Sequence, residues 1–582
     1  MARVPRGWRT TLVLPVVASL AIAGPVLASD AAALITSGSP TTTFPQNKQN
    51  EPAIAIDPLN PKIMAAGSND EIDLEACAAG NPTTCPFTDG VGVSGIYFSI
   101  DGGTSWTQPT YTGWSARSCT SPGTCTPGVG PIGTLPNYHE NGLVSDGDPM
   151  LAFGPKPDSN GHFSWGNGVR LYYGNLTSNF SSQRSETAFK GFEAIAVSRT
   201  DHLTAAAAGD NSAWMAPVIV SKQNAALFSD KDGLWVDNAA TSPNFGNVYV
   251  CNVAFRGAAG SEPVMFTRST DGGDTWSGQL QLSPATNNSQ TGGRQGCAIR
   301  TSSTGTVYVF WEGTNVKTGQ SVQYMTRSFD GGVTFERPRI VANVVDVGQF
   351  DVTTGRASFD GVAGARTDSF PSVDIANGAP SGDGATNTIV MTWSNGSTPT
   401  DTHGGPNEQA AVVWSTDGGN TWSGPVNAAP SGDRPDFPAV AIAPDGSTVY
   451  VTYDNFLQPW QSDTSKARSM QGVVRGVSIA DIGTASAWTD LHRGPTGDAR
   501  ASAQNNLVAE FLGDYNSIAA TGDGAYAVFN DVRGAADCSA VDAWRMMVVD
   551  GTATNENRPA VNDSTVCPDT FGNSDIYGVF TP

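Results

Sequence analysis

The sequence has few charged residues and especially few basic ones. Only 15% of its 582 residues are charged, and 32 Lys and Arg stand against 54 Asp and Glu, which gives a formal net charge of -22. Proteins that bind nucleic acid broadly, or that adsorb to anionic membranes, need a basic face. The composition therefore excludes both classes, although it allows a local basic pocket.

Histidine is scarce as well, and the common catalytic and metal-binding motifs are missing. The chain has five His and no Cys-x-x-Cys, His-Glu-x-x-His, Gly-x-Ser-x-Gly or phosphate-binding loop. We therefore expect no His-rich metal site and no cofactor. Structural calcium in the acidic segments Asn69-Asp70-Glu71 or Asp230-Lys231-Asp232 is the alternative, although neither fits an EF-hand pattern.

Long apolar runs are absent except at the N-terminus. There Arg3, Arg6 and Arg9 precede an apolar run, and Val26-Leu27-Ala28 offers a cleavage site. This pattern predicts a signal peptide over residues 1–28 that is removed on export. The run is short and contains Pro15, which argues against a membrane anchor. We expect a secreted protein without a membrane span, and a monomer.

Cysteine is present in an even number, eight. Export makes disulfides the default for these residues. Two close pairs would pin Gly-, Pro- and Thr-rich loops, a third pair would pin the C-terminal region, and two cysteines in strand-like runs remain. In that order they are Cys77 with Cys85, Cys119 with Cys125, Cys538 with Cys567, and Cys251 with Cys297. Spacing alone leaves the connectivity open.

Glycine and proline are abundant, at 66 and 37 residues, and 39% of the chain is hydrophobic. This combination is typical of an all-β protein with many turns. One turn motif recurs four times, at 99–106, 269–276, 328–335 and 415–422; the first copy reads Ser99-Ile100-Asp101-Gly102-Gly103-Thr104-Ser105-Trp106. Asp-Gly-Gly supplies positive φ for a hairpin, and the aromatic residue starts the next strand.

A longer unit surrounds these turns and occurs seven times between about residue 50 and the C-terminus. Each unit opens with a polar group and supplies two apolar strands, a third strand that leads into the turn, and a fourth after it. The openings are Glu51, Asp148, Asp232, Arg294, Asp368, Asp436 and Asp514. Four-stranded units repeated around an axis form a β-propeller. We predict seven blades over residues 50–582, with six as the alternative, and a leader or closing strand at 29–49.

The turn motif, Ser-x-Asp-x-Gly-x-Thr-Trp, resembles the Asp-box, or bacterial neuraminidase repeat, of the sialidase-like β-propellers. The resemblance implies a carbohydrate site at the axial mouth. Sialidases use three Arg on the substrate carboxylate, a Tyr nucleophile activated by a Glu, and an Asp acid/base. Asp514-Tyr515-Asn516-Ser517 resembles the family's Tyr motif, and Arg468-Ser469-Met470 resembles its last Arg segment. By this resemblance the catalytic candidates are Tyr515, Glu312 as its base, and Asp436.

The mouth of a propeller is lined where the innermost strands start and the second strands end. The polar residues expected there are Glu51, Asp70, Asp148, Asp232, Arg294, Glu312, Arg366, Asp368, Arg434, Asp436, Asp454, Asp514, Tyr515, Asp531 and Arg533. Arg forks bind carboxylates in a bidentate manner. The predicted ligand-binding residues are Arg294, Arg366, Arg434, Arg468, Arg533, Asp368 and Asp514. The alternative is that these Arg and Asp residues pair with one another or hold neighbouring blades together.

One part of the sialidase pattern is absent. The family's first Arg lies in a Phe/Tyr-Arg-Ile-Pro motif, and here that place reads Asn50-Glu51-Pro52-Ala53. The sequence therefore predicts first an exported propeller that recognises a carbohydrate or glycoconjugate. A sialidase-type glycoside hydrolase is the alternative. A protein-binding adhesin or scaffold is the second alternative.

Overall fold

The computed structural model describes residues 32–40, 44–76, 87–119, 126–221, 227–256, 262–283, 295–351, 356–358, 366–396, 408–459 and 463–582. The predicted signal peptide, three of the predicted disulfide cysteines (Cys77, Cys85 and Cys125) and Arg294 lie outside these residues.

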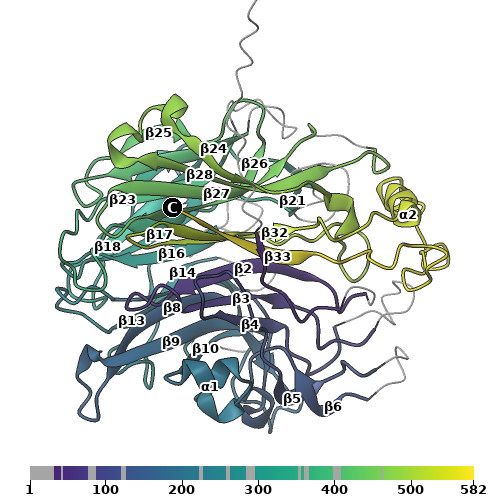
Figure 1. Ribbon diagram of the computed structural model, residues 1–582, viewed down its shortest axis with the longest axis horizontal. Helices are drawn as coiled ribbons and strands as arrows, with labels where there is room; N and C mark the ends of the chain where they lie inside the picture. The colour runs from purple at the N-terminus through teal and green to yellow at the C-terminus, as the bar shows by residue number, and fades with distance from the viewer. Residues whose placement is uncertain are drawn as a thin grey trace, which may run out of the picture.

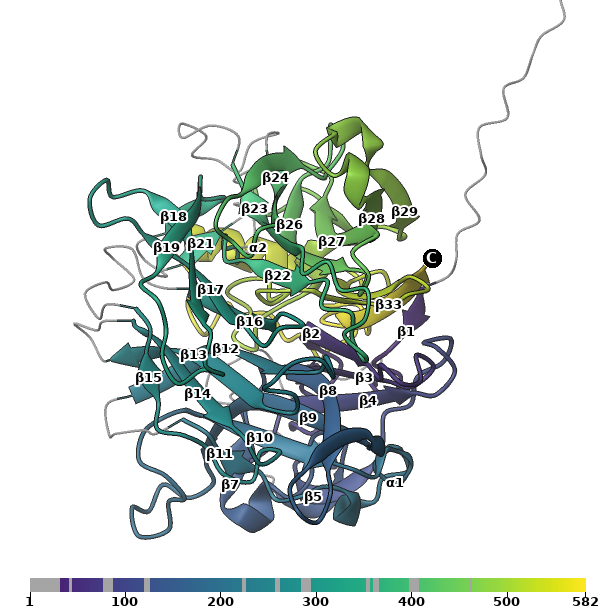
Figure 2. The same ribbon diagram turned by 90° about the vertical axis from the view of Figure 1, so that its left-hand side faces the viewer.

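The described chain forms seven antiparallel sheets around a central axis, which confirms the predicted seven-bladed propeller. Figure 2 shows the ring of blades, with the inner strands β2, β8, β12, β16, β22 and β26 around its centre. The first three blades are β2 (Gln49–Ile56), β3 (Met64–Asp70) and β4 (Ser94–Ser99); β8 (Met150–Pro157), β9 (Phe163–Asn179), β10 (Ala194–Thr200) and β11 (Val218–Ile219), with β7 (Leu143–Ser145) on β9; and β12 (Leu227–Val236), β13 (Val248–Arg256), β14 (Val264–Ser269) and β15 (Leu280–Gln281).

The other four blades follow the same order from the axis outward. They are β16 (Gln295–Thr301), β17 (Val307–Thr314), β18 (Ser321–Ser328) and β19 (Arg339–Asn343); β22 (Ser372–Ile375), β23 (Ile389–Asn395), β24 (Gln409–Ser415) and β25 (Ser423–Asn427); β26 (Pro435–Ile442), β27 (Thr448–Phe456), β28 (Ser469–Ser478) and β29 (Thr489–Arg493), with β30 (Gly497–Asp498) on β28; and β31 (Ser517–Ala520), β32 (Ala525–Asp531), β33 (Asp575–Thr581) and β1 (Ala33–Leu34).

The last blade joins the two ends of the described chain. Its outer strand, β1, pairs with β33, placing Ala33 opposite Gly578 and Leu34 opposite Tyr577. Thr36 Oγ1 then donates to Asp575 Oδ1 at 2.9 Å, and both residues are buried. Because the pairing carries full backbone hydrogen bonds, it closes the ring.

Apolar layers between neighbouring blades form the core. In one layer Ile54, Met64 and Tyr97 of the first blade pack with Tyr526 and Val528 of the last. Similar clusters fill the spaces between the other neighbouring sheets. Each sheet is therefore covered on both faces, which explains why the inner strands are nearly continuous apolar runs rather than alternating ones.

The four Asp-Gly-Gly turns share one hydrogen-bond pattern. In the first, Gly103 N donates to Ser99 Oγ at 2.9 Å, and Ser105 N donates to Asp101 Oδ1 at 3.0 Å. The equivalent bonds recur around Asp271, Asp330 and Asp417. Gly103 has φ +82°, and a Cβ there would lie 1.9 Å from the Tyr526 ring. Only glycine fits this close approach.

Each of these turns docks on the preceding blade through a carbonyl of its glycine pair. The donors are Tyr526 Oη to Gly103 O (2.9 Å), Arg170 Nη1 to Gly272 O (2.9 Å), Arg268 Nη1 to Gly331 O (2.9 Å) and Arg327 Nη1 to Gly418 O (2.6 Å). Three of the four donors are Arg, so part of the scarce basic charge holds neighbouring blades together.

Two insertions lie outside the seven blades. The hairpin β5 (Tyr111–Ser115) and β6 (Gly128–Ile132) lies at the bottom of Figure 1, and helix α2 (Ser539–Val549) lies at its right-hand edge. The remaining described elements are β20 (Gln349–Asp351), β21 (Arg356–Ser358), α1 (Leu203–Ala207) and the 3-10 helices His139–Asn141, Asn211–Ala213, Ile479–Asp481, Ala485–Ala487 and Ala499–Ala501.

Cys251–Cys297 joins the third and fourth blades, and Cys538–Cys567 pins the segment around α2. Cys119 is disulfide-bonded as well. The longer of the two described α-helices has 11 residues, so the described part of the chain contains no helix that crosses a membrane.

Candidate functional site at the axial mouth

A repeated backbone feature shapes the mouth. In four blades the inner strand begins with a β-bulge, between Asn50 and Ala53, Asp230 and Gly233, Gln295 and Ala298, and Asp436 and Ala439. In each bulge, the residue that follows the first one has a left-handed φ. These residues are Glu51 (56°), Lys231 (53°), Gly296 (62°) and Phe437 (47°). Asp148 opens the second blade in the same conformation, at 54°. Such backbone strain in non-glycine residues clusters at functional sites.

Two of these bulges, those at Glu51 and Lys231, border a polar cavity of about 190 Å³. Its lining includes Asn50, Glu51, Asn69, Asp148, Lys231, Arg366, Phe511 and Asp514. A second cavity of about 140 Å³ lies deeper along the axis and shares Asp148 and Lys231 with the first. Asp232 and Tyr515 also line the deeper cavity. The start of the inner strands therefore forms a two-part pocket.

Two cations and two carboxylates form a network in the outer cavity. Arg366 Nη2 lies 3.0 Å from Glu51 Oε1 and 3.0 Å from Asp514 Oδ1. The Lys231 ammonium contacts the other oxygen of Asp514. The Arg366 guanidinium also lies 4.4 Å from the centre of the Phe511 ring. Because each cation already has a carboxylate partner, the network is fixed before any ligand arrives.

Asp148 and Glu51 form an acidic pair with unequal surroundings. Glu51 accepts from Arg366 and, at 2.7 Å, from Asn69 Nδ2, as a carboxylate does. Burial, followed by the negative charge of Glu51, raises the pKa of Asp148 well above its usual value. The surroundings of Asp148 therefore favour its protonated form.

Tyr515 lies beside this pair with its hydroxyl enclosed. The hydroxyl has no hydrogen-bond partner among the described residues, and neither carboxylate oxygen of Asp232 has one. Burial, and then the charges of Asp148, Glu51 and Asp232, raise the pKa of Tyr515 well above 10. The phenol is therefore neutral. Enclosed polar groups without protein partners call for a specific explanation, and a bound polar molecule is one.

The comparisons with known proteins show similarity in structure only. No family model matches the sequence, and no curated protein matches it. Among solved structures, the chain is similar to the α-L-arabinofuranosidase Arb93A of Fusarium graminearum, with 13% identity, a TM-score of 0.38, and 76% of this chain and 94% of that one covered.

It is also similar to an α-L-arabinanase of Penicillium chrysogenum, with 11% identity, a TM-score of 0.38, and 74% of this chain and 92% of that one covered. A third similar structure is the NanB sialidase of Streptococcus pneumoniae, with 11% identity, a TM-score of 0.37, and 74% of this chain and 67% of that one covered. Similarity at these levels carries no functional argument, so the roles of residues rest on the geometry of this chain.

The predicted acidic residues fall into separate places. Asp514 lies at the mouth, as described above. Burial, and then the charges of Asp368 and Asp346, raise the pKa of Glu312, so these three groups form a cluster of their own. Asp436 is buried and accepts from Thr367 Oγ1 at 2.7 Å. The carboxylates that act on Tyr515 are therefore Asp148, Glu51 and Asp232, whereas Glu312 faces Asp368.

The predicted arginines are likewise divided. Arg366 lines the mouth cavity. Arg434 is buried and paired with Glu408 at 3.2 Å, and Arg468 is buried and donates to the carbonyls of Gln458 and Pro459. Arg533 pairs with Asp531, its guanidinium lying 3.9 Å from the centre of the Tyr577 ring. For these last three residues the contacts match the alternative in which Arg holds the fold together.

Sequence reasoning missed Lys231 and Phe511 as mouth residues. Lys231 was visible only as part of an acidic segment. A signal for it did exist, since it occupies the same place in its bulge as Glu51 does in the first blade. Among the residues that the structure describes, no group of three or more His, Cys, Asp or Glu side chains is placed to hold a metal ion.

Proposed function

We propose that this protein is an exported propeller that binds a carbohydrate at its axial mouth. The observation that carries the proposal is the preformed network of Arg366, Lys231, Glu51 and Asp514 around one cavity. Such a network offers donors and acceptors at fixed positions, which suits the many hydroxyl groups of a sugar. The exposed Phe87 at the same cavity, with 59% of its surface accessible, adds an apolar surface.

Direct binding tests this proposal. We expect the purified protein to bind members of a glycan array, and isothermal titration with the strongest glycan to show a loss of about tenfold or more in Arg366→Met, because Arg366 holds two mouth carboxylates in place. Arg339→Met is the matched control, since Arg339 is an exposed Arg that pairs with Glu336 outside the mouth. Absence of binding to every glycan, or equal affinity in Arg366→Met, would contradict the proposal.

A second candidate function is glycoside hydrolysis, and the unequal pair Asp148 and Glu51 favours it. A protonated Asp148 is suited to give its proton to the leaving oxygen of a glycosidic bond. Tyr515 is suited to attack the sugar as a neutral phenol, with Glu51 taking the phenolic proton. These assignments place the base at Glu51 rather than at Glu312, because Glu51 and Tyr515 both line the mouth pocket together with Asp148, whereas Glu312 does not line it.

Turnover of a panel of fluorogenic glycosides, including sialosides and arabinosides, tests hydrolysis. We expect Tyr515→Phe and Asp148→Asn each to lower kcat roughly a hundredfold to ten-thousandfold, and Glu312→Gln to leave it within about twofold. No turnover on any substrate would remove the enzyme function while leaving the binding proposal in place. Turnover that is unchanged in Tyr515→Phe would remove the role of Tyr515.

A further inference from the structure

A larger cavity lies at the other end of the propeller axis. It has a volume of about 310 Å³ and is lined by the last residues of the inner strands, among them Ile56, Val236, Ile375 and Ile442. The outer mouth cavity is lined by the first residues of the same strands, so it and the far cavity lie at opposite ends of the ring. The deeper mouth cavity lies between them and meets the far cavity at Ala53, Met150, Leu234 and Arg300, which line both.

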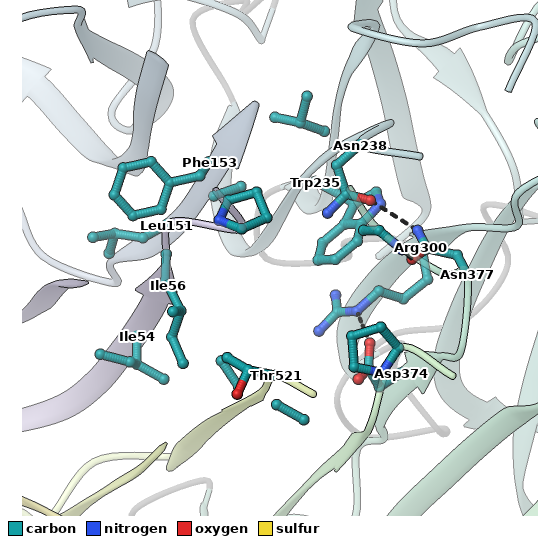
Figure 3. A pocket seen from close by; sticks show the side chains of 18 of the residues that line it. Ile54, Ile56, Leu151, Phe153, Trp235, Asn238, Arg300, Asp374, Asn377 and Thr521 are labelled. Carbon is teal, nitrogen blue, oxygen red and sulfur yellow. Dashed lines mark hydrogen bonds and ion pairs between the residues drawn. The ribbon is translucent and has the colours of Figure 1, made fainter. Parts of the chain in front are cut away.

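One wall of the far cavity is apolar. Figure 3 shows Ile54 and Ile56 of β2 and Leu151 and Phe153 of β8 on one side of the space. These side chains come from the inner strands of two neighbouring blades, and each strand is held by its pairing with the next strand of its own sheet, β2 with β3 and β8 with β9. A volume of this size with a hydrocarbon wall is typical of a site for a small organic molecule.

The opposite wall carries an Arg side chain in a fixed orientation. The Arg300 guanidinium stacks on the Trp235 ring at 4.3 Å, and Trp235 Nε1 donates to Thr301 Oγ1 at 2.9 Å. Arg300 Nε donates to Asp374 Oδ1 at 3.1 Å, and Nη1 donates to Ile299 O at 2.8 Å. Figure 3 shows the far end of the guanidinium directed into the cavity, towards the apolar wall.

The groups on this wall that can still form hydrogen bonds are mainly donors. Asp374 already accepts from Arg300 and, through Oδ2, from Ile442 N at 2.9 Å. Asn238 Oδ1 accepts from Asn377 Nδ2 at 2.8 Å, which leaves the Asn238 amide NH₂ as a donor. Within the described part of the chain, Arg300 Nη2 has no hydrogen-bond partner. The wall is therefore suited to an acceptor group such as a carboxylate.

We propose that this far cavity binds a small monocarboxylate with an apolar body. The carboxylate would lie on Arg300 and Asn238, and the hydrocarbon part would pack against Leu151 and Phe153. The presence of Asp374 beside Arg300 does not forbid this arrangement. In the mouth of the same protein, Arg366 bridges two carboxylates, those of Glu51 and Asp514.

Titration with 4-phenylbutyrate tests the proposal, because this probe joins a carboxylate to an apolar ring through a short chain. We expect the natural protein to bind it in the millimolar range or tighter, and to bind the neutral 4-phenylbutanamide about tenfold more weakly. Arg300→Met should abolish this preference for the charged probe. Leu151→Trp, which fills the cavity without changing the polar wall, should abolish binding of both compounds.

Two controls make the outcome decisive. Circular dichroism establishes that each variant is folded; if Leu151→Trp is not, Asn238→Leu takes its place, with an expected loss of about threefold or more. Arg339→Met should bind the probe as the natural protein does, because Arg339 lies outside the far cavity and pairs with Glu336. Failure of the natural protein to bind, equal affinity for acid and amide, or unchanged binding in the cavity variants would each overturn the proposal.

Discussion

Single residues in unusual backbone conformations set the geometry of the mouth. Glu51, Asp148 and Phe437 have a left-handed φ, and each is followed directly by proline. Proline has no N–H to give to a strand ladder, so it is tolerated where a bulge interrupts the ladder. The conformation turns the residue before the proline out of the strand's regular alternation. The acidic pair Glu51 and Asp148 owes its proximity to this repeated feature.

Tyr515 gives a prediction at this scale. Its hydroxyl is enclosed and has no partner among the described residues, so removing it relieves a desolvation cost. Tyr515→Phe should therefore leave the free energy of unfolding unchanged or raise it by up to about 1 kcal/mol, even where it abolishes turnover. Chemical denaturation measures this change.

Tyr526→Phe is the matched comparison. The Tyr526 hydroxyl donates to Gly103 O and accepts from Trp106 Nε1, both at 2.9 Å. Its removal leaves a buried donor and acceptor without partners and should lower the free energy of unfolding by about 1–3 kcal/mol. If both variants lost equal stability, Tyr515 would be a structural residue rather than one kept for a ligand.

Turns and strands were the elements that sequence analysis predicted best. The Asp-Gly-Gly turns follow from local chemistry, because Ser and Asp supply the side-chain acceptors and the two Gly supply the positive φ, all within five residues. What each turn docks against was not predictable, since Arg327 and Gly418 are 91 residues apart. Arg434 and Arg468 show the same limit, because their positions at strand ends did not reveal that their side chains are buried.

The contacts between turns and blades give a prediction at the scale of elements. Arg327 donates to Gly418 O at 2.6 Å and to Asn420 Oδ1 at 3.0 Å across the boundary between two blades. Arg327→Met should lower the free energy of unfolding by about 1.5–3 kcal/mol, because these are charged hydrogen bonds at a buried site.

Arg339→Met provides the control for that change. Arg339 shares Glu336 with Arg327 and reaches Asn420 Oδ1 only at 3.4 Å, and its side chain is exposed, so its loss should alter the free energy of unfolding by about 0.5 kcal/mol or less. Denaturant midpoints of the two variants separate the effects. Equal midpoints would show that the contact across blades adds nothing beyond a surface ion pair.

At the scale of the whole molecule, many buried carboxyl groups make stability depend on pH. Burial raises the pKa of Asp237 and Asp575 to about 7 and that of Asp454 to about 8. Between about pH 4 and pH 8 the folded state holds protons that the unfolded chain has lost, so stability falls as pH rises through this window. We expect the Tm to be higher near pH 5 than near pH 8.

Asp454→Asn tests the cause of this dependence. The amide cannot ionise, so the variant should lose less stability than the natural protein between these two pH values. Asp523→Asn, at an exposed turn, should keep the natural dependence. A Tm that is constant or rises with pH would contradict the assignment. At the other extreme, hydrogen bonds led by those from Thr421 lower the pKa of Asp417 to about 2, so this turn weakens only in strong acid.

The ring and its number of blades were predictable because seven similar units are visible in the sequence, and a repeated unit needs neighbours to bury its faces. The site was predictable only in part. Asp148, Asp232, Arg366, Asp514 and Tyr515 do meet at the mouth. Lys231 was missed because a bulge shifts the strand by one residue and so changes which side chains face the axis.

The pairing of Ala33 with Gly578 also affects the order in which the blades can form during synthesis. During synthesis β1 leaves the ribosome long before its partner strand β33, because residues as distant as Ala33 and Gly578 pair. Until β33 arrives, the first blade has no neighbour on one side, and its apolar face stays in contact with water or chaperones. Contacts between such distant residues make folding slow. A nascent chain that stalls before residue 575 would be an open arc, exposed to aggregation at both ends.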